Sequence, residues 1–259
     1  LFGSDGIAST RFLYTVKMAA GEKWTSEVWE ADYDGGNARQ LTKDSGYAIT
    51  PSYVPAKQGF ASGNFVYVSY KTGQPKIYYQ SLKDKEPHRI SFLRGNQFMP
   101  VISPQRDKMA FISDVTGNPD LFILPFSPDE GVKGKPYQIY ATHKATQGTP
   151  TFSPDGKKIA FVSNKDGTPR IYMMDIPSPG KNLKDIKAAL VTKQNGESTA
   201  PAWSPDGTKI AYCAMTKGVR QIWVYDLVKK EERQLTQGAG NKENPAWAPN
   251  SLHLIYNCS

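Results

Sequence analysis

The sequence has few of the residues from which metal sites, disulfide frameworks and histidine-based catalytic centres are built. Among 259 residues there are two cysteines and three histidines. Cys213 and Cys258 have no metal-ligand spacing, and their positions in the repeats described below predict side chains on opposite faces, with no bond between them. The histidines form no H-x-x-x-H pattern, and no G-x-S-x-G segment occurs. These absences predict a chain without a metal site, a cofactor or a catalytic centre.

Long apolar runs are also lacking. No stretch approaches the roughly 18 uncharged apolar residues of a membrane-spanning helix. The first ten residues do not have the basic and apolar halves of a secretory signal, so we expect any such signal to be absent from this chain. The formal charge is +8, from 32 basic and 24 acidic residues. Because the basic residues are scattered among turns, they indicate a solvated surface, or attraction to an acidic partner or anionic surface, rather than nucleic-acid binding.

What the chain does contain is a repeated segment. Residues 151–176, TFSPDGKKIAFVSNKDGTPRIYMMDI, return fifty-one positions later at 202–227 as AWSPDGTKIAYCAMTKGVRQIWVYDL. Each copy predicts a short strand after a proline, a Ser-Pro-Asp-Gly turn, two strands joined by a hairpin, and a short fourth strand. In the second copy, the second, third and fourth strands are expected at 209–214, 221–227 and 233–236. These two copies follow the prolines at 150 and 201, and weaker copies follow the prolines at 51, 100 and 245.

The middle strands of each copy are apolar on both faces, as in Ile159–Val162 and Ile222–Tyr225. A sheet with one solvated face would alternate, whereas a sheet between two neighbours would not. The sequence therefore predicts an all-β fold, a six-bladed β-propeller of four-stranded antiparallel blades, in preference to a two-sheet sandwich. Blade 1 lacks its first strand and blade 6 is partial, so we expect ring closure to be incomplete. The expected divisions are an entry linker 1–11 and blades 12–46, 47–94, 95–145, 146–196, 197–240 and 241–259.

Recurring carboxylates are the main candidates for catalysis. Asp32, Asp175 and Asp226 end third strands, and Asp155 and Asp206 lie in equivalent turns. A catalytic pair is needed once in a molecule, whereas these residues recur with the module. We therefore expect them to form turn and strand-end hydrogen bonds.

The SPDG-x-KIAF opening, the RIYMMDI and QIWVYDL continuations, and the entry segment GIASTRFLYTVK resemble the propeller of the TolB family over essentially the whole chain. The resemblance implies a periplasmic, non-enzymatic interaction module of the Tol–Pal cell-envelope system. Its partner would be the peptidoglycan-associated lipoprotein Pal, and its role would be outer-membrane integrity and cell division. Other Tol proteins would be contacted through an N-terminal α/β domain, which has no counterpart here, so we expect both ends of a longer chain to be missing.

The predicted binding site is formed by the segments that enter the first strands, because first strands line a propeller channel and their entries would meet at one mouth. Ordinary surface loops are the alternative. Tyr47, Phe98 and Met99 are the apolar members of these segments. Carried over from the family, the contacts would be Asn96, Gln97, Phe98, Met99, Gln147, Gly148 and Thr149, with Glu197, Ser198, Thr199, Glu243 and Asn244 completing the mouth.

Two other functions share the repeat. The chain could be the propeller of a prolyl-oligopeptidase-like serine peptidase, whose hydrolase domain would lie outside this sequence and would contain a G-x-S-x-G segment. It could also be a polysaccharide lyase, but that requires channel-facing histidine or arginine groups with a metal. The entry segments before Pro150 and Pro201 contain neither residue.

Overall fold

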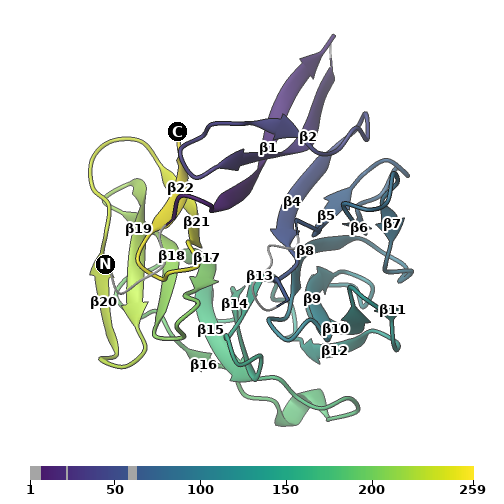
Figure 1. The fold of residues 1–259 in the computed structure, drawn as a ribbon. Helices are drawn as coiled ribbons and strands as arrows, with labels where there is room; N and C mark the ends of the chain where they lie inside the picture. Colours follow the sequence, from purple (N-terminus) through teal and green to yellow (C-terminus); the bar gives the residue numbers. More distant parts are fainter. Residues whose placement is uncertain (1–6, 22, 58–62) are drawn as a thin grey trace. The chain divides into compact units, whose positions relative to one another are not determined.

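The computed structural model describes residues 7–21, 23–57 and 63–259, and nearly all of its regular structure is β-strand (Figure 1). Of the expected linker 1–11, residues 1–6 lie outside the described residues. Among the described residues no helix is long or apolar enough to cross a membrane. The chain forms two compact units. The N-terminal unit comprises Ala8–Gly117 and Phe122–Tyr137, and the C-terminal unit comprises Ile7, Asn118–Leu121 and Gln138–Ser259.

The N-terminal unit contains all the strands of two sheets and most of a third sheet. The first sheet has the order β1-β2-β3, with β1 (Arg11–Ala20), β2 (Lys23–Asp32) and β3 (Arg39–Gln40). The second has the order β4-β5-β6-β7, with β4 (Ala48–Tyr53), β5 (Phe65–Ser69), β6 (Lys76–Gln80) and β7 (His88–Arg89). The third contains β8 (Gln97–Ile102), β9 (Lys108–Ser113), β10 (Asp120–Ser127), β11 (Gly131–Val132) and β12 (Tyr137–Tyr140), and the unit boundary passes through β10 and β12. The strand β11 was not predicted. It forms because the chain reverses after β10 and pairs with the end of that strand, Phe126 with Val132.

The C-terminal unit contains three further sheets. One has the order β13-β14-β15-β16, with β13 (Gln147–Phe152), β14 (Lys158–Ser163), β15 (Arg170–Asp175) and β16 (Ala189–Leu190), and the 3₁₀ turn η1 (Leu183–Asp185) lies between the last two. The next has the order β17-β18-β19-β20, with β17 (Ser198–Trp203), β18 (Lys209–Thr216), β19 (Val219–Asp226) and β20 (Glu231–Gln234). The last pairs β21 (Lys242–Trp247) with β22 (Leu254–Cys258).

The hairpin of β18 and β19 differs from the prediction. The sequence predicted strands at 209–214 and 221–227, with a wide connection around TKGV between them. Instead, β18 extends to Thr216 and β19 begins at Val219, so the turn has only two residues. The turn residues Lys217 and Gly218 have φ angles of 49° and 81°. Positive φ at both positions is the requirement of a type I′ hairpin turn, which continues the strands with little splay. The fourth strand correspondingly begins earlier than expected, at Glu231.

The turn after four of the first strands, β8, β13, β17 and β21, has one geometry despite different sequences. In the two SPDG copies the amides of Gly156 and Gly207 donate to the carbonyls of Ser153 and Ser204, at 2.8 and 2.9 Å. The third-strand aspartates and these turn aspartates form local hydrogen bonds, as predicted; Asp206 Oδ1, for example, accepts from the Thr208 amide at 2.9 Å. Glycine supplies the positive φ in these two turns. The equivalent positions in the third and last sheets are Arg106 and Ser251, with φ of 60° and 58°, so the module maintains the left-handed turn without glycine.

Every first strand carries a β-bulge immediately before its proline. The ladders between first and second strands shift register at this point in all five cases. The residue before the proline has a positive φ each time: Thr50 49°, Met99 52°, Thr149 38°, Ala200 50° and Asn244 52°. A non-glycine residue in this region is strained by about 1 to 2 kcal/mol. Bulges of this kind bend a strand at a rim and re-aim its side chains.

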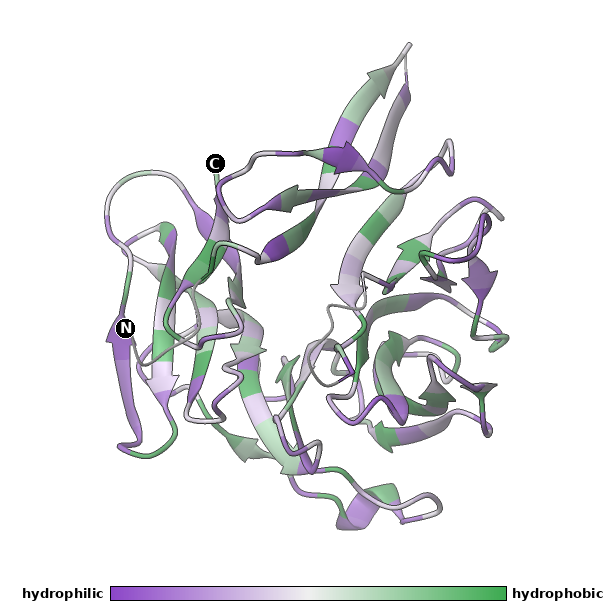
Figure 2. Cartoon of the chain, viewed as in Figure 1, coloured by the Kyte–Doolittle hydropathy of each residue, from purple (hydrophilic) through white to green (hydrophobic). Residues whose placement is uncertain are grey.

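Both faces of the middle strands are buried between neighbouring sheets, as the sequence predicts. All five residues of β5 are buried; Phe65 and Tyr67 belong to a core with the first sheet, whereas Val66 and Val68 belong to a core with the third. In the C-terminal unit Ile210 and Tyr212 of β18 pack with the preceding sheet. On the other face the free, buried Cys213 contacts the Lys242 carbonyl at 3.5 Å, while the free Cys258 is exposed. Figure 2 shows the corresponding contrast between apolar bands on β18 and β19 and the hydrophilic outer strand β20.

The strained residues predict unequal effects of glycine within one strand. Ala200 lies at positive φ in β17, whereas Ala202 of the same strand does not. Glycine relieves the strain at Ala200, which offsets its own entropic cost of about 0.5 to 1 kcal/mol, and at Ala202 only the cost remains. We therefore expect Ala200→Gly to be more stable than Ala202→Gly by about 1 kcal/mol in urea denaturation. Equal destabilisation by the two variants would contradict the left-handed assignment.

Candidate partner-binding site

The predicted site residues divide between the two units and differ in exposure. Tyr47 and the Asn96–Met99 segment belong to the N-terminal unit, and the remaining segments belong to the C-terminal unit. Tyr47 and Asn244 are exposed. The partly exposed residues are Asn96, Phe98, Met99, Gly148, Thr149, Glu197, Thr199 and Glu243. Gln97, Gln147 and Ser198, which begin their first strands, are buried.

The buried glutamines bind the chain itself. Gln97 Nε2 donates to the Leu93 carbonyl at 3.1 Å, and its Oε1 accepts from the Ile77 amide at 3.4 Å. Gln147 Nε2 lies 3.4 Å from the carbonyl of Ala145 and from an oxygen of Asp120. Because the Nε2 groups of both glutamines donate within the chain, they position the entry segments and leave contact with a partner to the exposed neighbours.

A second set of buried polar residues, which the sequence reasoning missed, fixes the loops that lead into the entry segments. They occupy the third-strand position directly before the apolar run, and we call this the loop-anchoring position; its buried members are Glu27, Lys76, Asp120 and Gln221. In β15 the same position holds Arg170, which is only partly buried. The carboxylate of buried Glu27 accepts from Thr42 Oγ1 at 2.5 Å and from the Ser45 amide at 3.0 Å. A polar residue recurring next to an apolar run is the sequence signal that could have revealed this position.

In two other sheets a buried lysine donates to loop carbonyls, whereas Glu27 accepts from loop amides. Lys76 Nζ donates to the carbonyls of Leu93 (3.4 Å) and Gly95, and burial lowers the pKa of this ammonium, with the nearby Arg89 adding to the effect. Lys242, which begins β21, donates to the carbonyls of Gly238 (3.3 Å), Ala239 and Gly240 (3.0 Å). Charged hydrogen bonds of this kind are stronger than neutral ones, so these loops are held firmly.

The entry segments are also fixed from the second strand. Asp114, just after β9, accepts from the Asn96 amide and from Asn96 Nδ2, both at 2.7 Å. In the next sheet Asn164 Oδ1 accepts from the Thr146 amide at the same distance. The backbone of the entry segment is thereby held at a strand end, and the side chains that follow it are presented from a fixed base.

The apolar members of the site lie in the N-terminal unit. The ring of Tyr47 makes an edge contact with Tyr70, with centroids 5.9 Å apart, and keeps 43% of its surface exposed. Phe98 is the last paired residue before the bulge of β8 and Met99 lies in the bulge, and both are partly exposed. Amphipathic and aromatic side chains on a rigid base are typical anchors of protein interfaces.

The charged members lie in the C-terminal unit around an arginine that the sequence reasoning missed. Arg220 Nη1 donates to Glu243 Oε1 at 2.6 Å, and its Nη2 lies 3.7 Å from Glu197 Oε1. The guanidinium therefore joins the entry segments of two consecutive sheets. Sequence spacing gives no hint of this contact, because Arg220 comes from a hairpin rather than from an entry segment.

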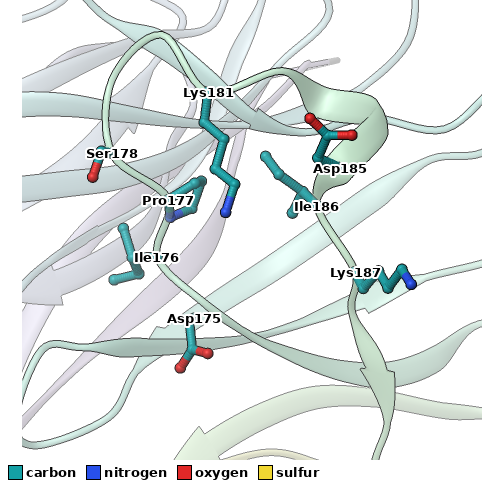
Figure 3. A pocket seen from close by; sticks show the side chains of 8 residues that line it. All are labelled: Asp175, Ile176, Pro177, Ser178, Lys181, Asp185, Ile186 and Lys187. Carbon is teal, nitrogen blue, oxygen red and sulfur yellow. The ribbon is translucent and has the colours of Figure 1, made fainter.

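The C-terminal unit also contains a cavity of about 290 Å³, which lies apart from the entry segments (Figure 3). It is lined by Asp175, Ile176, Pro177, Ser178, Lys181, Asp185, Ile186 and Lys187. These residues follow β15, whereas the entry segment of the next sheet adjoins the residue before β15, since the Ser198 amide donates to the Pro169 carbonyl at 2.8 Å. The cavity is thus at the other end of the strand.

Within the described residues no group of three or more histidine, cysteine or acidic side chains is placed to hold a metal. Comparison with known proteins gives the assignment that the geometry alone does not. The family described as the TolB beta propeller domain matches residues 1–183 and 180–259. A TolB homolog of Protochlamydia amoebophila is 62% identical over 94% of this chain, and one of Chlamydia abortus is 45% identical over 92%. The chain belongs to the TolB family.

The solved structures give the fold. TolB from Acinetobacter baumannii superposes with a TM-score of 0.77 at 23% identity, covering 97% of this chain and 59% of that one. The prediction of an all-β propeller is therefore confirmed. A mycobacterial puromycin-hydrolyzing peptidase also superposes, with a TM-score of 0.60 at 13% identity, covering 90% of this chain and 39% of that one, and this likeness shows the fold alone. The chain spans about half the length of the two chlamydial TolB homologs, 53% and 54%.

The turn carboxylates of this TolB-family chain predict a pH dependence of stability. Burial raises the pKa of Asp206, but hydrogen bonds from Ser204 and Thr208 outweigh it and lower the pKa to about 2. A lowered folded-state pKa contributes stability above the unfolded value, about 3.9, that is lost as the pH falls towards 2. We expect Asp206→Asn to flatten the fall of the melting temperature between about pH 4 and pH 2, modestly because the carboxylate is 39% exposed.

The exposed Asp185 in η1 provides the control, because within the described residues its side chain makes no hydrogen bond or ion pair, and the flattening by Asp206→Asn should exceed that by Asp185→Asn. The same slope in wild type and Asp206→Asn would show that the turn hydrogen bonds do not favour the carboxylate.

Proposed function

We propose that this chain is a non-enzymatic, protein-binding module of the periplasm that docks Pal through the entry segments of its first strands. The observation that supports this most strongly is the contrast within each segment. Buried groups such as Gln97 and Lys76 hold the backbone, while the neighbouring side chains Phe98 and Met99 remain partly exposed. Rigid presentation lowers the ordering cost that a flexible loop would bear on binding.

In this proposal the role of the chain is that of the Tol–Pal system, in outer-membrane integrity and cell division. Contacts with other Tol proteins belong to the part of the relatives' length that this chain does not span. The recurring aspartates support an interaction role over a reaction, because each has local hydrogen-bond partners that explain its presence, such as Thr208 for Asp206.

We further propose that the blades complete a six-bladed ring in the full-length protein. The supporting observation is that the first sheet has three strands and the last has two, while their neighbours have four or more. In such a ring all five entry segments would border one mouth, and both the apolar and the charged members of the site would face the same partner.

The proposal predicts that Phe98 contributes to Pal binding far more than a more exposed phenylalanine outside the entry segments. Truncating a central aromatic anchor commonly costs about 2 kcal/mol or more, so Phe98→Ala should weaken binding at least about tenfold in a calorimetric titration with purified Pal. Phe92, which is 76% exposed in the same unit, is the matched control, and Phe92→Ala should leave affinity unchanged.

Equal effects of the two substitutions would argue against the entry segment as the contact. Absence of binding by the folded wild-type chain would refute the proposed partner. Circular dichroism of both variants confirms that any loss does not come from unfolding.

A further inference from the structure

Arg220 departs from a pattern that three of the other sheets share. The residue before the loop-anchoring position is Pro75, Pro119 and Pro169 in three sheets, and its carbonyl accepts from the first amide of the next first strand at 2.8 to 3.0 Å. In the sheet of β17–β20 this position is Arg220. Its backbone amide, which proline lacks, donates to Asn241 Oδ1 at 3.0 Å. Arginine at this position therefore adds a main-chain hydrogen bond to Asn241, just before β21, and a side-chain hydrogen bond to Glu243 at the start of β21.

The side chain of Arg220 joins two carboxylates that would otherwise repel each other. It is hydrogen-bonded to Glu243 at 2.6 Å and lies 3.7 Å from Glu197, and the three side chains are 40%, 26% and 35% exposed. A planar guanidinium with several fixed donors can bind two carboxylates at once, which a lysine ammonium does less well. The result is a carboxylate pair at a fixed separation, with a net charge of −1 on a chain whose total is +8.

Three neighbours of the pair, Asn244, Asn257 and Met215, are uncharged. Asn244 Nδ2 donates to Asn257 beside Glu243, and Met215, which pairs with Arg220 across the hairpin, is 37% exposed. Each glutamate uses its Oε1 towards Arg220, so one oxygen of each carboxylate remains for another donor. A cationic side chain with several N–H groups matches this arrangement in charge and in hydrogen-bond type.

We infer that Arg220 is a positioning residue of the binding site: it holds Glu197 and Glu243 as one carboxylate pair, and that pair receives a lysine or arginine side chain of the protein partner. This inference rests on the proposed function for the identity of the partner. It does not require Arg220 to touch the partner.

A purely electrostatic role and a positioning role of Arg220 predict opposite effects of Arg220→Gln on Pal affinity, and this difference tests the inference. Removing the guanidinium makes the surface more negative, so charge alone would tighten the binding of a cation. If Arg220 positions the pair, the carboxylates separate and Pal binding weakens, by roughly fivefold to tenfold for a partly exposed site. Arg220→Lys should recover part of the loss, and Glu197→Gln and Glu243→Gln should each weaken binding and reduce its salt dependence.

The matched control is Arg233→Gln, which removes one positive charge from the exposed outer strand of the same sheet. Its effect on Pal affinity should be negligible. Tighter or unchanged binding by Arg220→Gln would overturn the positioning role. Weakening by Arg220→Gln with no effect of either glutamate substitution would also overturn it, because Arg220 would then contact the partner directly.

A measurement on the free chain separates this inference from the proposed function. A double-mutant cycle of unfolding with Arg220→Gln and Glu243→Gln should give a favourable coupling, and zero coupling would show that Arg220 does not hold Glu243. If the wild-type chain does not bind Pal at all, the proposed function and the assignment of the cation to Pal both fail. The cycle still decides the role of Arg220 within the chain.

Discussion

The structure depends on the need to bury both faces of the middle strands. Strands such as β5 and β18 have apolar side chains on each face, so a single sheet cannot satisfy them. The sheet of β5 therefore packs against the one before it and the one after it, as the separate cores on its two faces demonstrate. This stacking in chain order brings the start of each first strand against the preceding sheet, and the geometry of every entry segment follows from it. The side chains that fill these cores are largely interchangeable apolar residues, which agrees with a fold that persists at 23% identity.

The same stacking creates a polar problem, which different residues solve in different sheets. Where the chain passes from one sheet to the next, loop amides and carbonyls require hydrogen-bond partners, and buried side chains supply them. Near Glu27 the unpaired groups are amides, and a carboxylate accepts from them. Near Lys76 and Lys242 they are carbonyls, and an ammonium donates to them. The sign of the buried charge thus follows from which backbone group faces inward, so the position recurs although the residue type does not.

Much of the fold could be predicted from the sequence, because repeated proline, SPDG and two-sided apolar patterns constrain strands and turns directly. The positive φ of Arg106, Met99 and Ala200 could not, since these residues give no sign of a left-handed backbone and adopt it only under tertiary constraint. For the site, sequence reasoning treated all the polar residues of the entry segments as accessible. Gln97 and Gln147 are instead buried, because an amide that pairs with loop backbone is stable inside a sheet. The contact of Arg220 with two glutamates brings together three separate segments and has no local signature.

The entry segments of the N-terminal unit have apolar side chains, and those of the C-terminal unit have charged ones. The two units would therefore contribute differently to the affinity and the selectivity of the proposed recognition. The N-terminal unit offers Tyr47, Phe98 and Met99, whose burial would supply most of the binding free energy. The C-terminal unit offers the pair held by Arg220, where partly exposed charges contribute less to affinity than to the selection and orientation of a partner. Both kinds of side chain stand on bulged strands whose loops are fixed by buried groups. Substitution at the exposed positions can therefore change the partner while the backbone that presents them stays the same, which is what a repeated scaffold with variable entry segments requires.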